Sequence, residues 1–130
     1  MKKALPDTNA ISSLFMGNEK ILNHLAEAEQ IFISVFVLGE LYTGFKGGNK
    51  EKQNREILKN FILKNSVEIL NATIETAEFF SVIKNKLKIA GKPIPLNDVW
   101  IAAHALEHNA EIISYDKHFN LIDGLHIWSY

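Results

Sequence analysis

Residues 1–12 read MKKALPDTNAIS, and the fold can be worked out from the point at which this stretch turns polar. A short apolar run, residues 4–6, ends directly before Asp7. We interpret residues 4–6 as a strand and residues 9–16 as one or two helical turns. Because proline lacks the N–H that a strand donates to its neighbour, we expect Pro6 to end the pairing and Asp7 to turn toward the edge of the sheet.

Farther along the chain, compact apolar runs alternate with longer segments whose apolar residues recur at helical spacing. Strands that alternate with helices predict a parallel sheet with helices on both faces. We therefore expect residues 1–130 to form one α/β domain of three layers, with a central parallel sheet. The expected strands are residues 4–6, 30–34, 67–70, 111–114 and 125–128, and the expected helices are residues 9–16, 19–29, 35–45, 50–63, 73–89 and 97–108.

The composition is typical of a globular protein, since 47% of the residues are hydrophobic and 22% are charged. The absence of cysteine excludes disulfides and thiolate metal sites, and it suits a reducing cytoplasm. No apolar run approaches the ~18 residues that a membrane span requires, and the first residues turn polar too early for a signal peptide. We therefore expect a cytoplasmic protein that is not associated with a membrane.

The net charge is only −1, but the charges are unevenly distributed. Residues 46–92 contain ten Lys or Arg and five Asp or Glu, whereas the remainder contains four and ten. A basic middle beside acidic ends would guide a polyanion toward an acidic centre. The alternative is that these lysines only keep two helices solvated.

Four carboxylates lie where a functional site is expected in a parallel sheet. Ligands bind such sheets beyond the carboxyl ends of the strands, and Asp7 and Asp116 each follow a predicted strand. Asp98 lies in the first turn of an apolar helix, and Glu40 is the only charge in residues 35–45, VFVLGELYTGF. Each acid also has an ordinary alternative, as a helix cap, a loop residue or a solvent-facing helix residue.

If these four carboxylates converge, they require protons or a cation. Two ionised carboxylates ~5 Å apart repel each other by roughly 3 kcal/mol at an effective dielectric constant of 20. A site of oxygen ligands, with neither cysteine nor an organised set of histidines, favours Mg²⁺ or Mn²⁺. Such an ion binds phosphate oxygens and lowers the pKa of a bound water, so the predicted chemistry is hydrolysis of a phosphodiester.

The remaining motifs do not indicate a second site. His104 and His108 are four residues apart, but no glutamate follows His104, so the zinc-protease pattern is absent. No serine has the flanking glycines of a nucleophile elbow, so no catalytic serine is expected. No glycine-rich loop carries a phosphate-binding signature, so no organic cofactor is expected. We assign no catalytic role to His118, and we expect Trp100 to pack against the sheet.

Taken in order, the motifs resemble those of the PIN-domain ribonucleases, and among these the VapC-type toxins of bacterial toxin–antitoxin pairs. The resemblance covers essentially the whole chain. It rests on four motifs in register, namely DTN (residues 7–9), the GEL of residues 39–41, NDVWIAAHAL (residues 97–106) and ISYDKHF (residues 113–119). It implies a PIN-like fold and a magnesium-dependent endoribonuclease.

The resemblance also implies roles for particular residues and the presence of partners. The catalytic and metal-binding residues would be Asp7, Glu40, Asp98 and Asp116. The residues that hold the turn at Asp7 or orient neighbouring acids through hydrogen bonds would be Thr8, Asn9, Asn97 and Ser114. The implied cofactor is Mg²⁺ or Mn²⁺, the substrate is RNA cleaved to leave a 5′ phosphate, and the protein partners are a cognate antitoxin that blocks the acidic pocket and a second copy of the chain.

Three other functions compete with this interpretation. A phosphoacceptor signalling domain needs adjacent acids after the first strand and an aspartate that ends a middle strand, where this chain has Asn71. A housekeeping RNA-processing PIN nuclease shares the motifs, as does a non-catalytic RNA- or protein-binding module of the same fold. A gene for a DNA-binding antitoxin immediately upstream would distinguish the toxin from the housekeeping nuclease.

Overall fold

A computed structural model describes residues 2–130, in which strands and helices alternate along the chain. The strands are β1 (Lys3–Pro6), β2 (Gln30–Ser34), β3 (Val67–Leu70), β4 (Glu111–Ile113) and β5 (His126–Ile127). The α-helices are α1 (Thr8–Phe15), α2 (Glu19–Ala26), α3 (Val35–Gly47), α4 (Glu51–Ile62), α5 (Ile74–Ala90) and α6 (Leu96–His108), and η1 (Lys117–Leu121) is a short 3₁₀-helix. Among the described residues, no helix has the length and apolar character needed to cross a membrane.

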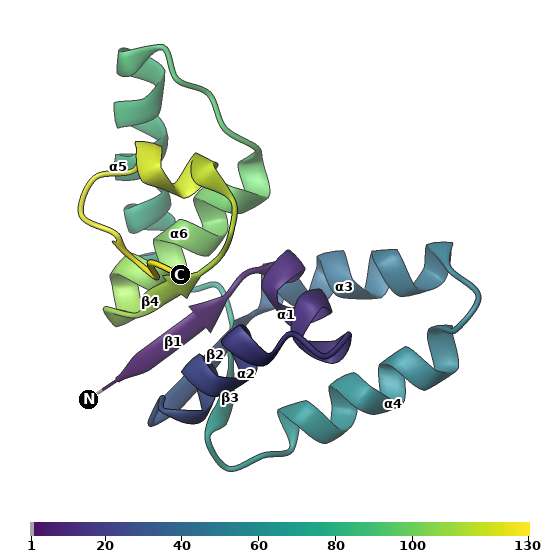
Figure 1. The fold of residues 1–130 in the computed structure, drawn as a ribbon. Coiled ribbons are helices and arrows are strands. Elements are labelled where there is room, and N and C mark those ends of the chain that lie inside the picture. Colours follow the sequence, from purple (N-terminus) through teal and green to yellow (C-terminus); the bar gives the residue numbers. More distant parts are fainter. Residues whose placement is uncertain (1) are drawn as a thin grey trace.

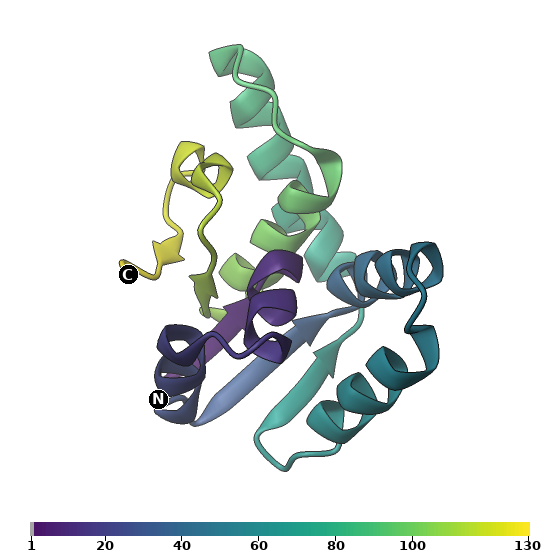
Figure 2. The same ribbon diagram turned by 45° about the vertical axis from the view of Figure 1, so that its right-hand side comes forward.

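The five strands form one parallel sheet in the order β3-β2-β1-β4-β5. Successive side chains on a strand point to opposite faces, so Ala4 of β1 packs with α1 and α2 while Leu5 packs with α6. Helices therefore cover both faces of the sheet (Figures 1 and 2), and the predicted three-layer α/β fold is confirmed. The strand order reverses between β1 and β4, and in such sheets this point forms a crevice at the carboxyl ends.

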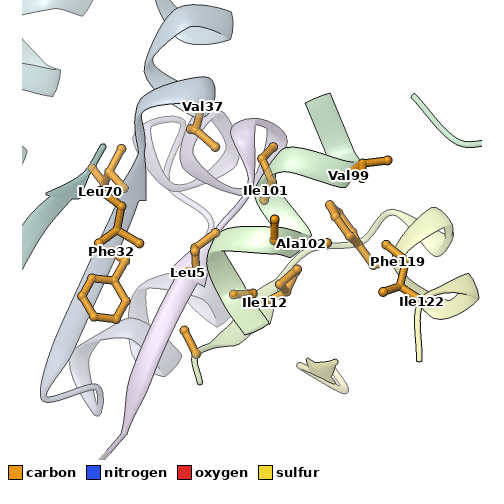
Figure 3. Packing of buried hydrophobic residues seen from close by; sticks show 14 of the residues in the cluster. Leu5, Phe32, Val37, Leu70, Val99, Ile101, Ala102, Ile112, Phe119 and Ile122 are labelled. Atoms are coloured by element: carbon orange, nitrogen blue, oxygen red, sulfur yellow. The ribbon is translucent and has the colours of Figure 1, made fainter. Parts of the chain in front are cut away.

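The core joins the elements on either side of this crevice (Figure 3). Leu5 of β1 and Ile112 of β4 are fully buried and project toward Ala102 of α6. Phe119 of η1, also fully buried, packs in the same cluster near Val99. Burying each large apolar side chain contributes about 1.5–3 kcal/mol. The core therefore holds the first turn of α6, the ends of β1 and β4, and η1 as one rigid unit.

Several element ends lie where the sequence predicts them because their caps have clear chemistry. The hydroxyl of Thr73 accepts a hydrogen bond from the Thr76 N–H at the start of α5. Gly91 and Asn109, at the C-terminal ends of α5 and α6, adopt the left-handed conformation with φ of 65° and 52°. By contrast, α2 ends three residues earlier than predicted, and η1 was not predicted as a helix.

The prediction that Pro6 ends strand pairing is wrong on one side of β1. Pro6 is still paired with Ile113 of β4, and the next N–H, that of Asp7, donates to the Ile113 carbonyl at 3.1 Å. Backbone N–H groups of a strand in a sheet alternate between its two neighbours, so the donor that Pro6 lacks would point toward β2. Pairing with β2 stops at Ala4. Pro6 therefore lies where pairing of β1 with β2 has ended, while pairing of β1 with β4 continues through it.

The expectation for Trp100 is also corrected. Its ring stacks on Phe80 of α5, with ring centroids 3.9 Å apart, and on Phe36 of α3 at 5.0 Å. The indole therefore joins three helices rather than covering the sheet. Aromatic stacking of this kind adds about 0.5–1.5 kcal/mol to the apolar burial.

Candidate active site

The four predicted carboxylates come from four different elements and converge at the switch point between β1 and β4. Asp7 follows β1 and caps α1, while Asp116 follows β4 and caps η1. Asp98 lies in the first turn of α6, and Glu40 lies in the middle of α3. The charges of Asp116 and Glu40 act on both Asp7 and Asp98, so the four groups form one electrostatic cluster.

Asp7 is the most deeply buried of these acids, with 6% of its surface exposed. Its Oδ1 accepts a hydrogen bond of 2.8 Å from the backbone N–H of Ala10, which makes Asp7 the N-cap of α1. Its Oδ2 accepts a short hydrogen bond from the Ser114 hydroxyl. The same Ser114 oxygen accepts from the Asp116 N–H at 2.8 Å. Ser114 thus contacts two of the acids at once, through a side chain that is itself buried.

Asp98 and Asp116 form the more open side of the cluster together with His118. Nδ1 of His118 lies 3.1 Å from Oδ1 of Asp116 and 3.3 Å from Oδ2 of Asp98. One ligand atom from each of the three side chains lies within 4.8 Å of the other two. The motifs of the sequence predict no role for His118. Its position two residues after Asp116 is nevertheless informative. The side chain of a capping aspartate accepts a hydrogen bond from the backbone N–H two residues later, which here is the N–H of His118.

The supporting residues are only partly arranged as the sequence predicts. Thr8 does not hold the turn at Asp7, because its hydroxyl instead donates to Oε1 of Glu40 at 2.6 Å. The turn is held by the side chain of Asp7 itself. Within residues 2–130, the side chains of Asn9 and Asn97 make no hydrogen bond to any of the acids, and Asn9 is exposed.

Burial raises the pKa of both the Asp7 and the Asp98 carboxyl above its ordinary value. For Asp7, the hydrogen bonds from Ser114 and Ala10 oppose this effect, and the negative charges of Asp116 and Glu40 add to it. For Asp98, the contact with His118 opposes the effect of burial. The folded chain therefore disfavours negative charge at both positions, and a bound cation would relieve this strain.

The donor set fits a divalent metal ion. Ligand atoms of Asp98, Asp116 and His118 lie within 4.8 Å of one another, the charges of Asp116 and Glu40 act on both Asp7 and Asp98, and no thiolate is present in the sequence. Hard oxygen ligands suit Mg²⁺ and Mn²⁺, and a surplus of mutually repelling carboxylates is a common feature of sites that hold such ions.

Comparison with known proteins agrees with this fold and identifies its family. The family model of the PIN domain matches residues 4–125. The chain belongs to the PIN-domain family. It is 31% identical over 124 residues to a ribonuclease VapC1 of Haemophilus influenzae, covering 92% of this chain and 91% of that protein. It is also 31% identical over 105 residues to a ribonuclease VapC2 of Rickettsia felis, covering 80% and 77% of the two chains.

Solved PIN-domain structures superpose closely on this one. The DNA-bound VapBC2 complex of Rickettsia felis contains a chain that matches with a TM-score of 0.87 and 26% identity, covering 98% of both chains. The VapBC-1 complex of nontypeable Haemophilus influenzae matches with a TM-score of 0.86 and 26% identity, covering 98% of this chain and 97% of that chain. The parallel sheet and its flanking helices are thus those of VapC structures.

Proposed function

We propose that this protein is a divalent-metal-dependent endoribonuclease of the VapC type, which hydrolyses RNA phosphodiester bonds with Mg²⁺ as its cofactor. The observation that carries the proposal is the convergence of Asp7, Glu40, Asp98 and Asp116 at the switch point of the sheet. The PIN-domain match and the VapC relatives support it. A non-catalytic binding module would not need four buried or half-buried acids at one edge of the sheet, two of which, Asp7 and Asp98, have pKa values raised by burial.

Each residue of the cluster has a role in this proposal. Asp7 and Asp98 are the main metal ligands, and Asp116 completes the pocket. Ser114 fixes the direction of the Asp7 carboxylate, and its hydrogen bond to the Asp116 backbone fixes the second acid relative to the first. When bound, a divalent ion lowers the pKa of a water molecule and neutralises the charge that develops on the departing 3′ oxygen.

Glu40 is the acid best placed to handle a proton. Oε1 of Glu40 accepts a hydrogen bond from the Thr8 hydroxyl, so Oε2 is the oxygen that would accept a hydrogen bond from an attacking water. Because Glu40 lies on α3, its carboxylate approaches the site from a direction different from those of the strand-end acids. We assign it the orientation of the water that attacks phosphorus and leaves a 5′ phosphate on the product.

We further propose that a cognate antitoxin regulates the enzyme and that both act in the cytoplasm. A groove of about 430 Å³ begins at Thr8 and Glu40 and runs between α1, α3 and α4. Its walls include the apolar side chains of Phe15, Leu41 and Phe45. An apolar segment of a partner would fill this groove, and a basic residue at its end would reach the acids.

The proposal includes a homodimer. Ile74, Val82 and Ile89 lie seven or eight residues apart on α5, so they share one helical face, and 81%, 54% and 78% of their surfaces are exposed. A second copy would cover this apolar stripe. Light scattering on the wild type and on Val82→Glu tests it, because a charge within the interface should leave only monomer.

The function is tested on protein purified away from any antitoxin and incubated with total tRNA and rRNA. We expect cleavage with Mg²⁺, none with excess EDTA, and recovery when Mg²⁺ is restored. RNA binding without cleavage under every condition would instead support a non-catalytic module. Cleavage that is unaffected by the chelator would contradict the metal mechanism.

A further inference from the structure

His118 is a candidate metal ligand that the motifs of the sequence do not reveal. Its Nδ1 faces one carboxylate oxygen of Asp116 at 3.1 Å and one of Asp98 at 3.3 Å. Within the part of the chain that the structure describes, this trio is the single group of three or more acidic or histidine side chains whose ligand atoms are close enough to share an ion.

The fold holds His118 in this position from the backbone. Its N–H donates to Oδ1 of Asp116 at 2.9 Å, so the turn that follows β4 fixes the start of η1. The next residue, Phe119, is fully buried in the core and anchors the other side of the same turn. The imidazole itself remains 47% exposed and contributes little to the core. Its direction toward the two acids therefore follows from local geometry rather than from packing of the ring.

The distances match those between neighbouring ligands of one small ion. Octahedral ligands bound at about 2.1 Å lie roughly 3.0 Å apart when they are adjacent. The two distances from Nδ1 of His118 exceed this separation by only 0.1 and 0.3 Å, since they are 3.1 and 3.3 Å. One ligand atom from each of the three side chains lies within 4.8 Å of the other two, so small side-chain movements would bring all three onto one ion. The same distances also suit an Nδ1–H group that donates to the acids, in which case His118 would compete with the ion.

We propose that His118 binds the metal ion through Nδ1 beside Asp98 and Asp116, and that this nitrogen makes the site of this chain prefer Mn²⁺ to Mg²⁺. The inference rests on the proposed metal-dependent function and deepens it. Mg²⁺ in proteins is bound by carboxylates, phosphates and waters, whereas Mn²⁺, as a transition-metal ion, also accepts an imidazole nitrogen beside carboxylates. Replacing one oxygen by a nitrogen therefore weakens the site for Mg²⁺ relative to Mn²⁺.

The test measures metal binding without RNA, so that it does not depend on activity. Calorimetry with Mn²⁺ and with Mg²⁺ gives the preference, and pulsed electron paramagnetic resonance of the Mn²⁺-loaded protein detects a directly bonded ¹⁴N. The variants are His118→Gln, which removes the ligand, and His118→Asp, which replaces it with oxygen. His126→Gln is the matched control, because His126 is an exposed histidine on β5, paired with Glu111 at the opposite end of β4.

We expect the ¹⁴N signal in the wild type and in His126→Gln, and its loss in both His118 variants. The preference for Mn²⁺ over Mg²⁺ should fall by about tenfold or more in His118→Gln, the size of effect seen when a group that supports a metal site is lost. His118→Asp should still bind ions but should favour Mg²⁺. Thermal unfolding of each variant should match the wild type, because the exposed ring is not part of the core.

Three results would overturn the inference in distinguishable ways. Mn²⁺ binding without a ¹⁴N signal, and with the same preference in His118→Gln, would remove His118 as a ligand and leave the proposed nuclease function intact. Tighter binding of both ions by His118→Gln would show that the histidine competes with the metal. Failure of the wild type to bind either ion would reject both this inference and the proposed metal-dependent function.

Discussion

Two polar clusters lie at the carboxyl ends of the same sheet, and they are built in opposite ways. Over β2 and β3, Ser34 and Asn71 meet His104 of α6, whose Nδ1 lies 2.9 Å from the Ser34 hydroxyl oxygen and whose Nε2 lies 3.2 Å from the Asn71 carbonyl oxygen. This neutral cluster is fully buried at His104 and Ser34. Over β1 and β4, the acidic cluster contains four carboxylates that interact through their charges, and it opens to solvent at His118, whose side chain is 47% exposed.

The difference shows that charge balance, not hydrogen bonding, distinguishes the functional cluster. Among the described residues, no buried side-chain nitrogen or oxygen lacks a hydrogen-bond partner, so both clusters are satisfied in that sense. Burial lowers the pKa of His104 and so keeps it neutral, whereas burial raises the pKa of Asp7 and Asp98, which leaves ionised acids that the fold disfavours. Only the acidic cluster lies where the strand order reverses.

The largest expected effect is the loss of cleavage in Asp98→Asn. The variant removes one negative charge from the metal site, and the rate on an RNA oligonucleotide in excess Mg²⁺ should fall by about 10³-fold, equivalent to roughly 4 kcal/mol of transition-state stabilisation. Thermal unfolding should be unchanged or slightly higher. Asp123→Asn, an exposed acid outside both clusters, is the control and should cleave normally. Wild-type activity in Asp98→Asn would place the chemistry elsewhere.

The next largest effect on cleavage is expected for Ser114 of the acidic cluster, and Ser34 of the neutral cluster provides the comparison. Ser114→Ala removes the hydroxyl that orients Asp7 and accepts from the Asp116 N–H, so cleavage should fall by about 10- to 100-fold. Ser34→Ala removes a partner of His104 and the N-cap of α3, which should cost about 1–3 kcal/mol of stability but leave cleavage unchanged. Rates and urea unfolding measured on both variants decide the point. Equal losses of activity would mean that the two clusters are not independent.

The sequence predicts the features of the fold and the site that depend on neighbouring residues, but not those that depend on contacts between distant ones. The strands, the parallel sheet and the positions of Asp7, Asp98 and Asp116 depend on local patterns, and these are visible in the sequence. The role of Pro6 depended on which neighbouring strand its missing N–H would face, a property of the folded sheet. Similarly, the bond from Thr8 to Glu40 joins residues 32 positions apart on two helices. Neither spacing nor composition encodes such a pairing.

The neutral cluster should make stability depend on pH. Burial lowers the pKa of His104 below its ordinary value of 6.5, so the folded protein keeps the ring neutral while the unfolded chain takes up a proton. The stabilisation is therefore present above pH 6.5 and is lost as the pH falls, by up to about 1.4 kcal/mol per pH unit for one proton. The free energy of unfolding, measured in urea at pH 7.5 and 5.5, should show this loss in the wild type.

His104→Gln provides the comparison for this measurement, because glutamine retains a polar side chain but has no proton to gain in this range. The variant should be less stable than the wild type at pH 7.5, and the difference should shrink at pH 5.5. A wild-type profile as flat as that of His104→Gln would show that the buried ring already carries its proton or that other groups compensate for it.

The smallest expected effect is that of Asp7 on the free energy of unfolding. Its dependence on pH has the opposite sign to that of His104. The raised pKa of Asp7 means that burial outweighs the hydrogen bonds from Ser114 and Ala10, so the fold favours the protonated acid. The contribution of this group to stability is therefore present below pH 3.8 and lost as the pH rises.

Asp7→Asn keeps an oxygen that can cap α1 and removes the charge. In EDTA at pH 7 this variant should therefore unfold at slightly higher urea than the wild type, with a gain in the free energy of unfolding of less than about 1 kcal/mol. Asp7→Ala, which also removes the cap, should unfold earlier than Asp7→Asn. If Asp7→Asn were less stable than the wild type, the carboxylate would be stabilising the fold, and the contrast between the charged and the neutral cluster would fail.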